Sequence, residues 1–180
     1  MNKQSIRLVI LVGIIFTSTY GFQFTLRFIL GTENPMVVVK GESMVPTYYD
    51  GDLLIIRGLP DKTQIEVGDI IVFHNPYALD TLIVHRVVKK TVSEGGLVLI
   101  TKGDNNHIQD QWRVQEEHVV GGVLQRIPYL GEVLTAIKSP FGLGIILCLI
   151  IFVYVVDLIY QNNKVINQPL EDDYAEVIKR

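Results

Sequence analysis

Two long apolar runs enclose a central segment in which short apolar runs alternate with polar turns. The first long run covers residues 8–30, with Arg7 before it and Arg27 near its end. The second covers residues 141–160 and carries one charged side chain, Asp157, near its end. Each run is long enough to span about 30 Å of hydrocarbon as a helix. The pattern therefore predicts two membrane-spanning helices.

Two other interpretations compete for the first run. A cleaved signal peptide would have a shorter apolar core followed by a small-x-small site, and Tyr20 interrupts that pattern. A buried core helix would not need basic residues at both ends, whereas Arg7 and Arg27 can extend to the two membrane interfaces. A retained anchor fits the run better than either alternative.

The segment between the two runs predicts strands. It contains short β-branched runs separated by Gly, Pro, Asn and Asp, and no helical pattern comes between them. These runs are residues 36–40, 53–57, 70–74, 81–88, 97–102 and 118–125. The expected fold class is therefore mainly β, an antiparallel sheet or partly closed barrel flanked by two transmembrane helices.

The two spans set the expected domain organisation. Basic residues at the very N-terminus favour a cytoplasmic start, and a second span returns the chain to the same side. The expected parts are a cytoplasmic end with an anchor (1–30), an exported β-rich domain (31–138), a second transmembrane helix (139–160) and a cytoplasmic tail (161–180). The tail is polar and of mixed charge, so we expect it to be solvated and partly disordered.

Composition excludes some classes of function. A net charge of -3 and a pI near 5.8 do not indicate the excess of basic residues that binding to nucleic acid requires, so no nucleic-acid partner is expected. Cys148 is the sole cysteine, which excludes an intramolecular disulfide. The positive mean hydropathy of +0.31 agrees with apolar residues concentrated in the two spans.

The stretch VVVKGESMVPTYYDGD, residues 37–52, is the first candidate for chemistry. Its apolar run predicts a strand that stops at Gly41, and the turn after it carries Ser43. A strand that ends in a turn can expose a hydroxyl to a substrate carbonyl while backbone N–H groups remain free for the oxyanion. A serine between a glycine and a proline is more often an ordinary turn former. The remaining chain must therefore supply a base and an acid.

His85 is the strongest candidate for a base. It stands in the middle of the predicted strand TLIVHRVV, on the opposite face from Val84 and Arg86. A polar ring there needs a partner, although such a histidine is more often structural than catalytic. The other histidines, at 74, 107 and 118, lie at strand ends or in a polar loop.

The loop TKGDNNHIQDQW supplies two acids, Asp104 and Asp110, directly after a strand. Either carboxylate could accept from the second ring nitrogen of a histidine and stabilise the imidazolium. The alternative for residues 103–106 is a plain turn. A metal site at His107 and Asp110 matches no defensible ligand spacing, so neither a metal nor another cofactor is expected.

Five blocks of the sequence together resemble the conserved boxes of type I signal peptidases. They are VVVKGESMVPTYYDGDLLIIRG, GDIIVFHNP, LIVHRVV, TKGDNN with the following Asp110, and VVGGVLQRIPYLG, in the family's order from about residue 36 to 131. Bacterial-type members carry a lysine where this chain has His85. The sequence is therefore similar to the branch found in archaea, in the endoplasmic reticulum and in some Gram-positive bacteria.

The resemblance implies a role for each candidate residue. Ser43 would be the nucleophile, His85 the general base and Asp110 the orienting acid, with Asp104 in a supporting role. One departure is that many relatives have a small hydroxyl residue two positions before the nucleophile, where this chain has Gly41 followed by Glu42. The second donor to the oxyanion is therefore left unassigned.

The expected function is that of a membrane-bound serine endopeptidase that removes N-terminal signal peptides from secretory preproteins at the outer membrane face. Its expected partners are signal peptides and the lipid bilayer, with the secretion translocon as a further candidate. Family members accept an extended strand with small residues at the first and third positions before the cut, which suits addition to a sheet edge near Ile70 and Ile83. Trp112 would lie against the headgroups or pack in the core.

The expected location is a cell membrane, or the endoplasmic reticulum membrane in a eukaryote, crossed twice with both termini cytoplasmic. Two alternatives stay open. One is a self-cleaving repressor-type peptidase, but these are cytosolic and use lysine. The other is a non-catalytic membrane protein that displays a β-domain as a receptor or assembly subunit.

Overall fold

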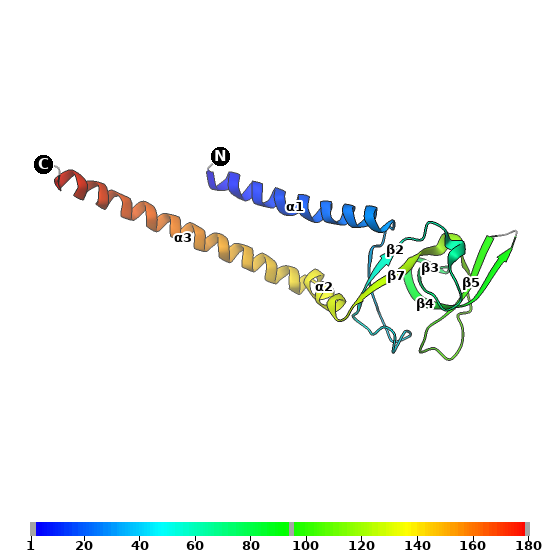
Figure 1. The fold of residues 1–180 in the computed structure, drawn as a ribbon. Helices are drawn as coiled ribbons and strands as arrows, with labels where there is room; N and C mark the ends of the chain where they lie inside the picture. The colour runs from blue at the N-terminus through cyan, green and yellow to red at the C-terminus, as the bar shows by residue number, and fades with distance from the viewer. Residues whose placement is uncertain (1–2, 94–95, 179–180) are drawn as a thin grey trace. The chain divides into compact units, whose positions relative to one another are not determined.

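A computed structural model describes residues 3–93 and 96–178 of the chain. The chain divides into two compact units, one ending at Glu132 and the other beginning at Val133. The first unit holds one long helix and all the strands (Figure 1). The second unit is helical.

Helix α1 (Lys3–Leu30) opens the first unit. Its Val9–Leu30 portion is long and apolar enough to cross a membrane, and none of that portion is buried against the rest of the protein. The helix predicted from residues 8–30 is therefore confirmed as a helix. Its apolar side chains have no protein core to cover them, as expected for a helix surrounded by lipid.

Seven strands form one open antiparallel sheet in the order β1-β2-β7-β3-β4-β5-β6. Two short 3-10 helices, η1 (Lys62–Gln64) and η2 (Glu116–His118), interrupt the connections. The strands are β1 (Met36–Val38), β2 (Leu53–Arg57), β3 (Ile70–Asn75), β4 (Ala78–Ser93), β5 (Gly96–Lys102), β6 (Val114–Gln115) and β7 (Val119–Ile127).

The predicted antiparallel strands are confirmed, with β4 longer than its apolar run. The sequence did not predict β6, because a strand of two residues leaves no alternation to detect. The sheet is open rather than barrel-like, and helices make up about 40% of the whole chain, so its overall class is mixed. The description "mainly β" holds for the sheet alone.

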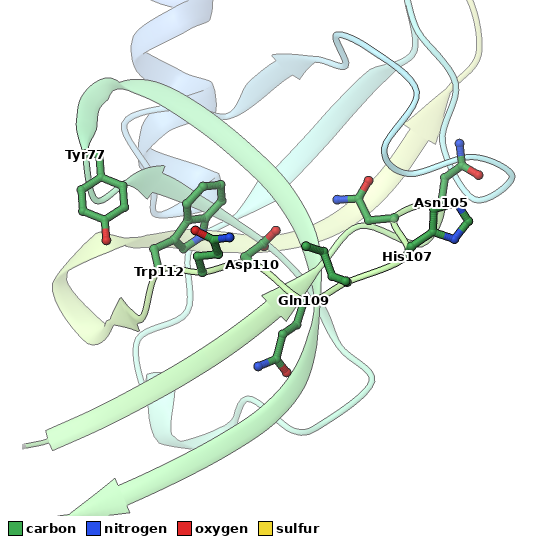
Figure 2. Close-up of a pocket in the computed structure, with 9 residues that line it drawn as sticks. Tyr77, Asn105, His107, Gln109, Asp110 and Trp112 are labelled. Atoms are coloured by element: carbon green, nitrogen blue, oxygen red, sulfur yellow. The ribbon is translucent and has the colours of Figure 1, made fainter.

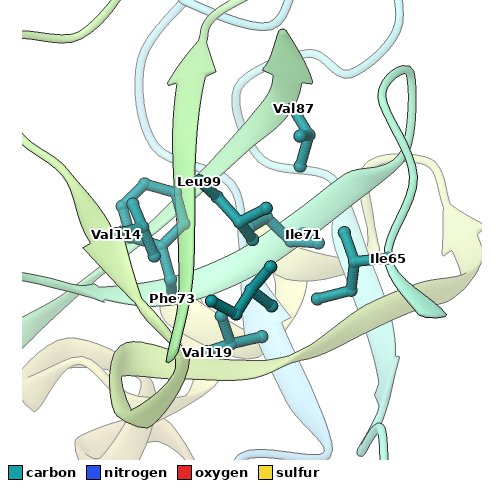
Figure 3. Packing of buried hydrophobic residues seen from close by; sticks show 8 residues of the cluster. Ile65, Ile71, Phe73, Val87, Leu99, Val114 and Val119 are labelled. Atoms are coloured by element: carbon teal, nitrogen blue, oxygen red, sulfur yellow. The ribbon is translucent and has the colours of Figure 1, made fainter. Parts of the chain in front are cut away.

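Both faces of β3 are buried. Ile71 and Phe73 point into one apolar cluster, which Figure 3 shows with Val87, Leu99 and Val119 around them. Val72, between them in sequence, points into a second cluster on the other face. Side chains alternate between the faces of a strand, so β3 supports a core on each side and holds its neighbour β4 in a fixed register.

The second unit contains most of α2 (Leu130–Lys138) and all of α3 (Pro140–Ile178). The Ser139 hydroxyl accepts from the Gly142 N–H at 3.1 Å, and Pro140 follows directly, which together form a favourable helix start. Pro140–Tyr160 is long and apolar enough to cross a membrane. The helix continues through the polar tail to Ile178, where composition had predicted partial disorder. Helix α2 was not predicted.

Two neighbouring glycines of β7 offer a test of this packing. A Cβ on Gly121 would lie 2.2 Å from the backbone oxygen of Arg57, whereas one on Gly122 would meet nothing nearer than the Leu59 side chain at 3.9 Å. We expect Gly121→Ala to destabilise the sheet by about 1–3 kcal/mol, because backbone must move to make room. Gly122→Ala is the matched control and should be neutral.

Thermal unfolding of the purified chain in detergent, followed through the β-sheet signal in circular dichroism, checks this prediction. Equal melting temperatures for the two variants would contradict the close approach of β7 to β2.

Candidate active site

A tight turn after β1 carries Ser43. At its start Gly41 adopts a φ of 85°, which a glycine tolerates, and its N–H donates to the Asp50 Oδ1 at 2.7 Å. The Val45 N–H donates to the Glu42 carbonyl at 3.2 Å. Met44 is only 1% exposed and anchors the turn in the interior. The neighbouring Ser43 hydroxyl is thereby directed toward the sheet edge.

Asp52 holds the far end of this stretch and is fully buried. Its carboxylate accepts from the Tyr49 N–H at 2.8 Å and pairs with the Arg126 Nε at 2.6 Å. The Arg126 guanidinium also lies over the Tyr49 ring, 5.2 Å from its centroid. A buried carboxylate needs such partners, and here they connect the turn to β7.

His85 lies in β4 opposite Ile71 of β3 and is 6% exposed. Its Nε2 is 3.2 Å from the Ser43 Oγ, and its Nδ1 is 2.6 Å from the Asp110 Oδ2. An ionised carboxylate only accepts hydrogen bonds, so Nδ1 carries the proton and donates to Asp110. Nε2 is then the acceptor that faces the Ser43 hydroxyl.

Asp110 is held by the end of β5. Its N–H donates to the Thr101 carbonyl at 2.8 Å, and its Oδ2 accepts from the Thr101 hydroxyl at 2.7 Å. Thr101 is fully buried, and the Asp110 side chain is 6% exposed. With water largely excluded, the carboxylate interacts more strongly with a charged imidazole than it would in solvent. The structure therefore brings Ser43, His85 and Asp110 into one chain of contacts.

Asp104 lies in the same loop and has different partners. Its two oxygens accept from the Arg86 Nε at 2.8 Å and from an Arg86 terminal nitrogen at 2.6 Å, and the Thr47 hydroxyl also donates to it. The hydrogen bonds from Arg86 lower the pKa of Asp104 below its usual value, and the bond from Thr47 adds to this effect. The same pairing raises the pKa of Arg86. Asp104 therefore stays ionised beside the site.

The loop that contains Asp104 also contacts the Ser43 turn directly. The Asn105 N–H donates to the Ser43 carbonyl at 2.8 Å, and the Asn105 side chain donates to the Glu42 carbonyl at 3.1 Å. A Cβ on Gly103 would lie 2.5 Å from the Ser43 carbonyl oxygen, so this approach requires a glycine. The Arg86–Asp104 pair thus anchors the loop against the turn from the side of β4.

The other histidines stay apart from this arrangement. His74 contacts the Leu79 carbonyl, His107 lies in a polar loop, and His118 belongs to η2. In the part of the chain that the structure describes, no three potential ligands gather into a metal site.

Sequence reasoning missed three residues that matter to the geometry: Thr47, Arg86 and Thr101. Arg86 was noted only as a neighbour of His85. Thr101 could have been suspected, because alternation along β5 places it inward with Leu97 and Leu99, where a hydroxyl needs a partner.

A groove of about 690 Å³ leads to Ser43 and His85 between β1 and β4. On the β4 side it is lined by residues 80–85, including Ile83, and on the other side by residues 37–40. Ile70 lines a different hollow, beside Arg86. Residues 82–84 of β4 pair with β3 on one side, and the pairing with β5 begins only at Arg86. The groove therefore has a sheet edge along each wall.

A second hollow of about 770 Å³ lies along the Asp110 loop. Figure 2 shows Tyr77 and Trp112 at one end and Asn105 and His107 at the other. The Tyr77 and Trp112 rings meet edge to face, with 6.4 Å between their centroids. Trp112 is partly buried and also packs against the core cluster around Phe73.

Comparison with known proteins places these features in a family. Residues 13–124, more than half of the chain, match the model of the Peptidase S24-like family. The chain is 37% identical over 159 residues to the signal peptidase complex catalytic subunit SEC11 of Yarrowia lipolytica. The aligned region covers 81% of this chain and 91% of that protein.

Two further relatives extend the comparison. Identity to the Schizosaccharomyces pombe catalytic subunit sec11 is 35%, covering 73% of this chain and 82% of that protein. Identity to the dog catalytic subunit SEC11C is 34%, and the aligned region covers 74% of this chain and 73% of that protein. The chain therefore belongs to the Peptidase S24-like family and, within it, to the signal peptidase catalytic subunits, which are serine peptidases.

Proposed function

We propose that the chain cleaves signal peptides with Ser43 as nucleophile, His85 as general base and Asp110 as the acid that orients the imidazole. The observation that carries the proposal is the continuous contact from the Ser43 Oγ through both ring nitrogens of His85 to the Asp110 carboxylate. This is the order of groups in which a serine is activated by an adjacent base and the base is held by a third group.

The chemistry follows from these contacts. As the Ser43 oxygen attacks the scissile carbonyl, its proton moves to the Nε2 of His85, and Asp110 stabilises the imidazolium. His85 then protonates the leaving amine, which departs as the mature protein's N-terminus. Water, deprotonated by the same nitrogen, releases the signal peptide from Ser43. Burial of His85 and Asp110 strengthens each electrostatic step.

The turn also supports an assignment for the oxyanion site. The Gly41 N–H already donates to Asp50, so it is engaged. The Ser43 N–H has no partner among the residues that the structure describes, and it is the donor that we assign to the oxyanion. Glu42 is exposed, and its backbone oxygen rather than its carboxylate contacts the Asn105 side chain.

The groove supports binding of the signal peptide as an extended strand. Its walls are the free edges of β1 and β4. Three strands lie between these two in the sheet and each pair of neighbours is antiparallel, so β1 and β4 run in the same direction, toward Ser43. A peptide laid between them can hydrogen-bond to both edges, and alternate side chains enter the apolar walls. The small residues that such substrates carry before the cut would fit beside Ile83 and Val84.

We also propose that both apolar helices cross the membrane and that the termini lie on the cytoplasmic side. Residues 31–138 then form the exported domain between an anchor at 1–30 and a second span at 139–160, with residues 161–180 as the cytoplasmic tail. Support comes from two helices with uncovered apolar surfaces and from the basic N-terminus. The names of the relatives describe subunits of a signal peptidase complex, and we infer similar partners for this chain.

Substitution of Ser43 and His85 tests the proposed nucleophile and base. Ser43→Ala should abolish cleavage of a preprotein by the purified chain in detergent or liposomes, because the attacking oxygen is gone. His85→Ala should reduce kcat by about 10²–10⁴-fold, the range typical of general-base catalysis. The readout is product formation on a gel, with circular dichroism as the control for folding. Normal processing by folded Ser43→Ala protein would refute the assignment.

The two aspartates should behave differently. Asp110→Asn keeps the shape of the site but favours the wrong tautomer of His85, and we expect a fall in kcat of up to about 10⁴-fold. Asp104→Asn removes the charge that Arg86 binds, and it should reduce kcat less while lowering stability. Rate and melting temperature measured together separate the two roles. A larger rate loss for Asp104→Asn would reverse the assignment.

Asp104 should also make stability depend on acid. The pKa of Asp104 is lower in the folded chain than in the unfolded chain, where it is about 3.9. The contribution of Asp104 to the free energy of unfolding is therefore fully present above the unfolded pKa, and it is lost as the pH falls through the folded pKa. The difference in melting temperature between wild type and Asp104→Asn should therefore shrink below about pH 4. Thermal unfolding at pH 2.5 to 7 tests this, and a constant difference would contradict it.

A further inference from the structure

Strand β5 carries one hydroxyl among the side chains that it directs into the interior. Leu97, Leu99 and Thr101 occupy alternate positions along the strand, and all three are buried. A buried hydroxyl costs free energy unless it is hydrogen-bonded, whereas a valine of nearly the same shape would fit this position without that cost. The threonine therefore has a role that core packing alone does not require.

The pairing of β5 with β4 places this hydroxyl on the same face of the sheet as His85. Thr101 lies directly opposite Val87. Val87 follows His85 by two residues, so the side chains of both residues and of Thr101 point to one face. Strand β5 ends one residue after Thr101, and the loop that follows brings Asp110 to the His85 ring.

Asp110 is attached to Thr101 at two points. The Asp110 N–H donates to the Thr101 carbonyl at 2.8 Å, and the Thr101 hydroxyl donates to the Asp110 Oδ2 at 2.7 Å. The same Oδ2 lies 2.6 Å from the His85 Nδ1. The backbone bond alone would leave the carboxylate able to rotate, because the last torsion of an aspartate side chain is broad and roughly two-fold. The hydroxyl removes that freedom.

Thr101 is a rigid donor. Its side chain is branched at Cβ, which restricts rotation about the first side-chain torsion. It is fully buried, in line with Leu99 and opposite Val87, both of which are also fully buried. The direction of the hydroxyl is therefore set by the packing of the core and not by the loop that carries Asp110.

We propose that Thr101 is a positioning residue for the reaction, whose hydroxyl holds the Asp110 carboxylate in the rotation that directs the His85 imidazole at Ser43. The inference rests on the proposed roles of Ser43, His85 and Asp110. A fully buried side chain does not reach a substrate in the groove, so Thr101 acts through Asp110 and on the chemical step rather than on binding. A misplacement of about 1 Å among catalytic groups can cost about 10²-fold in rate.

Thr101→Val removes the hydroxyl and keeps the branched shape of the side chain. We expect it to lower kcat for a preprotein by about 10–10²-fold at unchanged KM, measured on the full chain in detergent. Thr101→Ser keeps the hydroxyl and loses a methyl group. It should therefore retain most of the wild-type kcat while its melting temperature falls.

Thr32→Val is the matched control. Thr32 is another buried threonine, 8% exposed, and its hydroxyl donates to the Val120 carbonyl at 3.5 Å rather than to a residue of the site. Its replacement should lower the melting temperature and leave kcat at the wild-type value. Loss of a buried hydroxyl then affects the rate only at Thr101.

A proton NMR spectrum of the full chain reads the same contact without turnover. The Nδ1 proton of an imidazole that donates to a carboxylate resonates far downfield of the backbone amides, because the charge-assisted hydrogen bond is strong. His85→Ala identifies the signal among the four histidines of the chain. Thr101→Val should move this signal upfield or broaden it, whereas Thr101→Ser and Thr32→Val should leave it in place.

The outcomes distinguish failure of this inference from failure of the proposed mechanism. The role of Thr101 is overturned, and the mechanism stands, if folded Thr101→Val keeps the wild-type kcat and Nδ1 signal while Ser43→Ala and Asp110→Asn are impaired. An equal loss of kcat in Thr101→Ser and Thr101→Val also overturns it, because the hydroxyl would then not matter. Normal cleavage by Ser43→Ala refutes the mechanism and this inference with it.

A second pair of variants serves if Thr101→Val does not fold. Thr101→Ala differs from Thr101→Ser by the hydroxyl alone. The alanine variant should show the lower kcat and the displaced Nδ1 signal, and equal values for the two variants would overturn the role of Thr101.

Discussion

The ring of His85 connects every part of the site, and its position depends on a buried carboxylate. Asp110 binds Nδ1 at 2.6 Å, which leaves Nε2 as the acceptor that faces Ser43. An imidazole that is 6% exposed in the middle of a strand would otherwise lack a partner for a polar nitrogen, which costs free energy. Thr101 in turn holds the carboxylate. A chain of hydrogen-bond contacts thus extends from the Ser43 hydroxyl to β5, and the proposed chemistry of the serine depends on it.

A second pair of charges supports that chain without joining it. Arg86 follows His85 in β4, so alternation directs it away from His85 and toward Asp104. The loop holds the Ser43 turn through Asp104, which accepts from the Thr47 hydroxyl, and through Asn105, which donates to backbone carbonyls of the turn. The Asp52–Arg126 pair fixes the other end of the same stretch. The proposed nucleophile therefore lies on a turn that is held from two sides, as catalysis requires for groups fixed in place before the reaction begins.

In the proposed membrane arrangement, the sheet also relates the site to the bilayer surface. The edges of β1 and β4 form a groove that reaches Ser43, and its other end, at Asp80 and Thr81, lies at the end of the sheet to which α1 is bonded. An extended peptide has a rise of about 3.3 Å per residue, so with α1 crossing the bilayer as proposed, the length of the groove would set how far from the membrane surface a bond is cut. In the proposed arrangement, the anchor and the groove together set the distance between the bilayer and the cut for substrates whose apolar helix remains in the membrane.

The sequence alone was enough to determine the two apolar helices, the main strands and the candidates Ser43, His85, Asp104 and Asp110, because helix-length apolar runs, alternation and turn residues are local signals. Other features were decided only by the tertiary structure. Strand order places β7 between β2 and β3, and this brings together residues far apart in the chain. The pairing of His85 with Asp110 and of Arg86 with Asp104 depends on how the loop after β5 packs. Hydrogen bonds between residues far apart in the chain leave no periodic pattern in the sequence. The open form of the sheet and its two-residue strand β6 likewise come from long-range pairing, which local propensity does not encode.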